Sequence, residues 1–115
     1  MAENKLADLF MDLAVQTLQL CETIHGHSAL VNQLKRSVTS IGANIREANY
    51  AHGKADFIAQ LQIALKECYE TEYWLELFQR AGIAGLAGLD PLRRASGTIR
   101  RMRIASLNTA KKNHT

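Results

Sequence analysis

The chain has 115 residues, of which 47% are hydrophobic and 22% are charged, and its formal net charge is +3 at pH 7. This composition excludes a disordered chain, and the length predicts a single domain over residues 1–115. The amino-terminal run MAENKLADLF lacks the apolar core of a signal peptide, and no apolar segment reaches the ~18 residues that cross a bilayer. Cys21 and Cys68 match no metal motif and are expected to be free, buried thiols. We therefore expect a cytoplasmic protein.

Two amphipathic helices are predicted in the first half of the chain, over residues 4–25 and 29–50. Gly26 is expected to end the first helix and Ser28 to cap the second. Residues of the expected buried faces recur every three or four positions in both helices: Leu6, Leu9, Phe10, Leu13, Thr17, Leu20 and Ile24 in the first, and Leu34, Val38, Ile41, Ile45 and Ala48 in the second.

Two further helices are predicted over residues 54–81 and 90–108, with a polar basic tail from about residue 109. Gly53 is the expected N-cap of the third helix, Gly82 its Schellman-type stop, and Asp90 with Pro91 the start of the fourth. The buried stripes are expected to contain Phe57, Leu61, Ala64, Cys68, Leu75 and Phe78 in the third helix, and Leu92, Ala95, Ile99, Met102 and Ser106 in the fourth. Short connections make consecutive helices antiparallel, so the predicted fold is all-α, an up-down-up-down antiparallel four-helix bundle.

The central part of the chain carries a family resemblance, in the run RSVTSIGANIREAN and the later segments DFI, IALKE and ETEYWLEL. These segments, within residues 33–82, resemble a bacterial four-helix-bundle family whose founding members are encoded by intervening sequences inside 23S ribosomal RNA genes. Related accessory proteins of diversity-generating retroelements are pentamers that bind RNA and a reverse transcriptase. The resemblance therefore implies a homo-oligomer, with five as the preferred number of subunits.

Charge is segregated along the chain. Residues 1–90 contain seven Lys or Arg and eleven Asp or Glu, whereas residues 91–115 contain seven Lys or Arg and no acidic residue. A basic helix without carboxylates is the footprint of phosphate binding, which predicts RNA association. The alternative is that its arginines pair with the acidic third helix of the same or a neighbouring subunit. The candidate nucleic-acid-binding residues are Arg93, Arg94, Arg100, Arg101, Arg103, Lys111 and Lys112.

A second apolar stripe on the third helix predicts an oligomer interface. Ile63, Trp74 and Leu77 lie on the side opposite the expected core stripe, and aromatic anchors are typical of interfaces. The alternative is that this helix lies deeper in the core of its own chain.

The residues indicate no enzyme. Glu22 and His25 form one Glu-x-x-His pair, but a di-iron bundle needs two such pairs and further carboxylates, so we predict no catalytic, metal or cofactor site. The favoured function is a non-catalytic oligomeric scaffold that associates with RNA. The alternative is a protein interaction module anchored by Tyr69, Tyr73 and Trp74, and a metal-dependent bundle enzyme is disfavoured.

Overall fold

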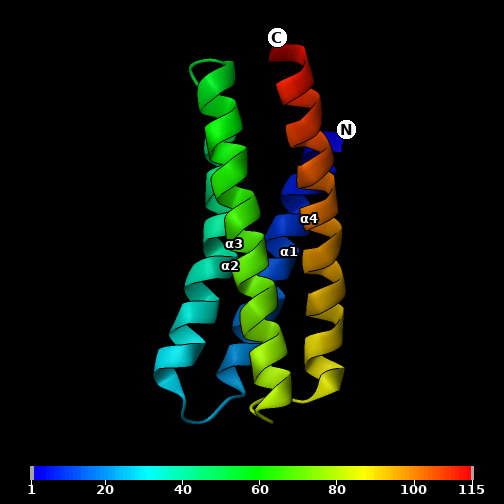
Figure 1. The fold of residues 1–115 in the computed structure, drawn as a ribbon. Coiled ribbons are helices and arrows are strands. Elements are labelled where there is room, and N and C mark those ends of the chain that lie inside the picture. The colour runs from blue at the N-terminus through cyan, green and yellow to red at the C-terminus, as the bar shows by residue number, and fades with distance from the viewer. Residues whose placement is uncertain (1, 115) are drawn as a thin grey trace.

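Four helices follow one another along the chain: α1 (Ala2–Glu22), α2 (Ser28–Ala48), α3 (Lys54–Arg80) and α4 (Leu86–His114). The structure, a computed structural model, describes residues 2–114 and the side chains of residues 7–112. Within residues 2–114 there is no strand, and successive helices run in opposite directions, as Figure 1 shows. The predicted all-α up-down-up-down bundle is thereby confirmed.

Each helix packs against two others, so that the bundle forms a closed ring of contacts: α1 with α2, α2 with α3, α3 with α4, and α4 with α1. The interior is filled by the apolar faces that the sequence predicts for α2 and α3. Leu34, Val38 and Ile41 of α2 are buried against Leu75 and Phe78 of α3 in one continuous cluster. A smaller cluster of Ala48, Leu61 and Leu107 lies between the end of α2, the start of α3 and the end of α4.

A buried polar pair joins α2 to α3 within this core. The Thr71 hydroxyl donates to Ser37 Oγ at 2.9 Å, and the Ser37 hydroxyl donates to the Leu34 carbonyl at 3.1 Å. Both side chains are fully buried, and their mutual hydrogen bond offsets the cost of taking two hydroxyls out of water. Thr71 is buried between Cys68 and Leu75 of the predicted stripe of α3, but the prediction did not include it.

The turns agree with the predictions in part. Gly53 is the N-cap of α3, and the backbone N–H of Gly82 bonds to the Gln79 carbonyl while that of Ile83 bonds to the Phe78 carbonyl, which completes the Schellman motif. The prediction for Ser28 is wrong. Ser28 is the first residue of α2, and the N-cap is His27, whose φ of 54° lies in the left-handed region beside Gly26 at φ 80°. α1 ends at Glu22, three residues earlier than predicted.

The bounds of α4 are also corrected. The helix begins at Leu86 rather than at Asp90, and Pro91 lies inside it. The earlier turn buries Leu89 completely and brings the Gly88 backbone against Leu20 of α1, so that a Cβ on Gly88 would lie 2.8 Å from Leu20 Cδ1. These tertiary contacts outweigh the loss of one backbone hydrogen bond at the proline. At the other end the predicted tail is helical through His114, because Leu107 and Ala110 give it a buried side.

Both cysteines are free and buried, as predicted. Burial raises the pKa of the Cys68 thiol to about 12 from the ordinary value of 9.0. Because the unfolded thiol ionises first, this residue's contribution to stability is present below about pH 9 and is lost as the pH rises toward 12. In a Cys21→Ala background we expect Cys68 of the folded protein to resist an aromatic disulfide reagent at about pH 8, while protein unfolded in guanidinium reacts at once. Equal rates in the two states would contradict the buried position.

Candidate nucleic-acid interface

The basic residues of α4 fall on three sides of the helix. At about 100° per residue, Arg94, Arg101 and Lys112 share one line, which we call the outward row, and it lies roughly 180° from the centre of the buried side. Arg93, Arg100 and Lys111 share a second line, the inner row, roughly 100° away from the first. Arg103 lies on neither row.

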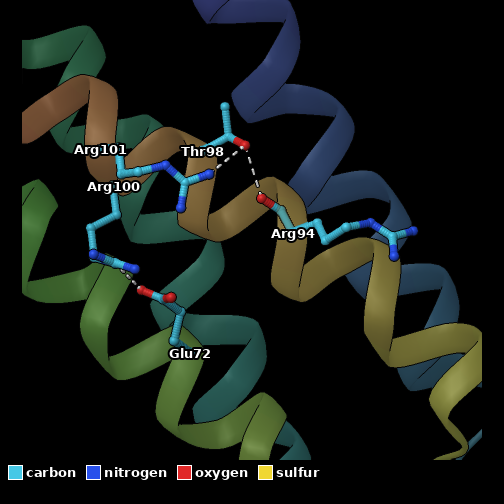
Figure 2. Close-up of polar contacts among 5 residues, drawn as sticks. All are labelled: Glu72, Arg94, Thr98, Arg100 and Arg101. Carbon is cyan, nitrogen blue, oxygen red and sulfur yellow. Dashed lines mark hydrogen bonds and ion pairs between the residues drawn. The ribbon is translucent and has the colours of Figure 1, made fainter.

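The outward row faces solvent. The Arg94 side chain is 72% exposed and pairs with Asp90 at 3.3 Å, one turn earlier on the same helix. Arg101 is exposed and donates to Thr98 Oγ1 at 3.3 Å. Figure 2 shows Arg94, Thr98 and Arg101 along the same helix, with the Arg101 guanidinium turned toward Thr98 and the Arg94 guanidinium away from Glu72. An exposed ion pair of this kind is worth at most about 1 kcal/mol, so Arg94 can exchange Asp90 for a phosphate at little cost.

The inner row is occupied by contacts to α3. Arg100 Nε donates to Glu72 Oε2 at 2.7 Å, and the Arg100 guanidinium lies 5.4 Å from the ring centre of Tyr69. Figure 2 shows this side chain crossing from α4 to Glu72 on α3. The hydrogen bond from Arg100 to Glu72 raises the pKa of Arg100, which keeps it charged.

Arg93 repeats this arrangement about two turns earlier on α4. It lies 3.8 Å from the Glu76 carboxylate and also donates to Gln79. For Arg93 and Arg100 the structure therefore agrees with the alternative, in which the arginines pair with the acidic third helix.

The predicted exposure of Arg103 differs from the structure. Its side chain is not on an exposed basic face but is buried, with 7% of its surface exposed, and its guanidinium lies 5.6 Å from the ring centre of Phe10 on α1. Met102, predicted to be buried, is exposed instead. Burial lowers the pKa of Arg103. The basic face available to a nucleic acid is therefore the outward row, with Lys111 beside its end.

The three predicted interface residues occupy different environments. Ile63 is 44% exposed, whereas Trp74 and Leu77 are partly buried and Trp74 packs against the core of its own chain. The indole N–H of Trp74 donates to Glu70 Oε1 at 3.5 Å, and its ring meets Tyr73 edge to face at 5.1 Å. Trp74 thus agrees with the alternative of a more deeply packed helix, whereas Ile63 faces solvent in the single chain.

Sequence reasoning missed an exposed apolar stripe on α1. Met11, Val15 and Leu18 are exposed and recur at spacings of four and three, so they share one face of the helix. This spacing is visible in the sequence. The exposed stripe was not recognised because the buried residues of α1 repeat with the same period on another side of the helix.

The residues considered for a metal site are not brought together. Glu22 is the last residue of α1 and His25 lies beyond it, so the Glu-x-x-His pair does not share one helical face. Within the part of the chain that the structure describes, no three His, Cys, Asp or Glu side chains gather as a metal site would require. Over the same residues, none of the four helices combines the length and apolar character needed to span a membrane.

Comparison with known proteins gives a match to the family described as "23S rRNA-intervening sequence protein" over residues 3–105. The chain belongs to this family. The match extends beyond residues 33–82, which carried the resemblance in the sequence, and includes α1 and most of α4.

A solved structure supports the same assignment. It is a protein of unknown function from the S23 ribosomal protein family from Bacteroides thetaiotaomicron, and it is 38% identical to this chain with a TM-score of 0.82. The match covers 89% of this chain and 97% of that one, so the two share the bundle fold over most of their length. A comparison with curated proteins finds no match.

Proposed function

We propose that this member of the intervening-sequence protein family is a non-catalytic homo-oligomeric bundle that associates with RNA through the outward row of α4. The observation that carries the proposal is the alignment of Arg94, Arg101 and Lys112 on the solvent side of one helix. The row extends about 27 Å, at the helical rise of ~1.5 Å per residue. Residues 91–115 contain no Asp or Glu to oppose a phosphate backbone.

The proposed binding is without base preference. Residues 91–115 contain no Phe, Tyr or Trp on which an unstacked base could rest, so the proposed contacts are those between cations and phosphates. Such contacts are individually weak. Repetition of the row around a closed ring of subunits, with five preferred, would raise the affinity because several rows could hold one RNA chain at once.

The test of RNA association removes two charges from the outward row. In Arg94→Gln/Arg101→Gln we expect weaker binding of a labelled single-stranded RNA, by a similar factor for every sequence tested. The slope of log affinity against log salt should become shallower by about 1.4, since each phosphate contact contributes about 0.7 for single strands. Fluorescence anisotropy at several salt concentrations measures both quantities.

A matched control removes the same charge elsewhere. Arg36 and Arg46 are exposed arginines on α2, and Arg36→Gln/Arg46→Gln should leave the slope unchanged. Equal losses in the two double variants would attribute binding to net charge and not to the outward row. Failure of the wild-type protein to retain RNA at about micromolar concentration and low salt would overturn the proposal.

A protein interaction module is the second candidate, and one observation favours it. Tyr69 and Tyr73 are exposed one turn apart on α3, and Trp74 lies edge to face with Tyr73. Exposed aromatic side chains of this kind are typical anchors of interfaces. If wild-type protein does not bind RNA, capture of a specific protein partner that is lost in Tyr69→Ala/Tyr73→Ala is the expected result.

A further inference from the structure

Arg103 is a buried cation for which the described side chains, those of residues 7–112, supply no ion-pair partner. The side chain is 7% exposed, and its Nε has no hydrogen-bond partner among the residues that the structure describes. Its guanidinium lies over the ring of Phe10, 5.6 Å from the ring centre. A buried guanidinium is costly unless a partner satisfies it, so the position indicates that another group completes it.

Arg103 lies on the wall of a cavity. The cavity has a volume of about 660 Å³ and lies between the first half of α1 and the second half of α2, with α3 and α4 at its base. Its lining includes Phe10, Val38, Ile45, Ala48 and Leu61, which are apolar, together with Arg103. In Figure 1 the end at which α1 begins lies on the α4 side of the bundle, away from α2.

The charges around the cavity leave Arg103 available. Among the described lining residues the one carboxylate is that of Glu47, which is exposed and is not ion-paired with Arg103. Arg46, the other charged residue of the lining, is also exposed and adds positive charge. The cavity therefore combines apolar walls with one buried positive group. Binding sites for small molecules are typically lined in this way, by apolar side chains and a few polar or charged groups.

We propose that this cavity binds a small amphiphilic carboxylate, whose anionic head pairs with the Arg103 guanidinium while its alkyl or aromatic body lies against Phe10, Ile45 and Leu61. A carboxylate matches the fork of a guanidinium with two parallel hydrogen bonds, and it would satisfy the unpaired Nε. The proposal is independent of RNA association, because Arg103 does not belong to the outward row.

Octanoate and octanol are suitable probes, since they share an alkyl chain and differ in the charged head. In titrations followed by nuclear magnetic resonance of isotope-labelled protein, octanoate should bind at least about tenfold more tightly than octanol, as expected of a hydrogen bond to a charged group. The Arg103 Nε–H resonance should shift with octanoate and not with octanol. This measurement on wild-type protein does not depend on any variant folding.

Arg103→Met keeps an unbranched apolar side chain and removes the charge, so octanoate and octanol should then bind with similar affinity. Its midpoint of thermal unfolding without ligand should equal or exceed that of the wild type, because a buried unpaired charge is removed. Arg101→Met, which alters the exposed neighbour on the outward row, should keep the discrimination. The proposal is overturned if octanoate at millimolar concentration leaves the Arg103 resonance unchanged, or if discrimination survives in Arg103→Met.

Discussion

Replacing Phe78 with Ala is expected to lower the free energy of unfolding by about 3–5 kcal/mol. Phe78 is 0% exposed and is the largest of the fully buried side chains. Its backbone carbonyl also accepts the N–H of Ile83 in the Schellman motif, and Ile83 packs against the same cluster. Truncation therefore removes apolar burial and leaves a cavity at the point where α3 turns toward α4. Domains of this size have a total stability of only about 5–15 kcal/mol.

Denaturation by guanidinium, followed by far-ultraviolet circular dichroism, measures the change at fixed protein concentration, since assembly shifts apparent stability. Tyr50→Ala is the matched control: it also truncates an aromatic residue, but Tyr50 is 80% exposed in the turn between α2 and α3. Its effect should stay within about 0.5 kcal/mol. A loss below about 1.5 kcal/mol for Phe78→Ala would show that the end of α3 is not packed as described.

Ile63→Glu is expected to convert the proposed homo-oligomer to a monomer. Because Ile63 is 44% exposed in the single chain, a carboxylate there stays in water and leaves the fold of the monomer intact. At the centre of a subunit interface the same carboxylate would be desolvated without a partner, at a cost of several kcal/mol. Trp74→Glu is a less selective test, because Trp74 packs against the core of its own chain.

Size-exclusion chromatography with light scattering measures the mass of each variant. Gln62→Glu adds the same charge at the adjacent exposed position and should leave the mass unchanged. A monomeric wild-type protein would overturn the assembly proposal. An oligomer that persists in Ile63→Glu would place the interface elsewhere, and Val15→Glu then tests the exposed stripe of α1.

Local sequence was sufficient for the four helices and for the inward faces of α2 and α3. Leu34, Val38 and Ile41 are large apolar residues at helical spacing with polar residues between them, so only one rotation of α2 buries them all. Local sequence was also sufficient for the Schellman turn at Gly82. This motif needs a glycine in the left-handed region and two hydrogen bonds to carbonyl groups in the last turn of the helix, and all of these residues are close in sequence. These features depend on neighbours in the chain, which a single sequence contains.

The rotation of α4 was decided by the tertiary structure. The predicted buried stripe includes Ala95 and Met102, whereas the observed one includes Ser96 and Arg103 in their place. At about 100° per residue, the centres of the two stripes lie roughly 60° apart around the helix. Around Leu92 and Ile99, which both stripes share, α4 is rich in small residues and arginines whose hydropathy does not select one face. Arg103 is turned inward by its contact with Phe10 of α1, which is remote in sequence.

The candidate site likewise combines features that local sequence determines with features that tertiary packing determines. That α4 is basic and free of carboxylates after Asp90 can be read from the sequence, and so can the alternative that its arginines pair with α3. Which arginines do so could not be read, because it depends on the rotation of α4 and on the reach of Glu72 and Glu76 across the helix pair. The sequence by itself determined the helices, their order and the charge that α4 carries. Only the packing of α4 against α1 and α3 decided which of those charges face solvent, because a helix rotates to bury the side that its neighbours can fill.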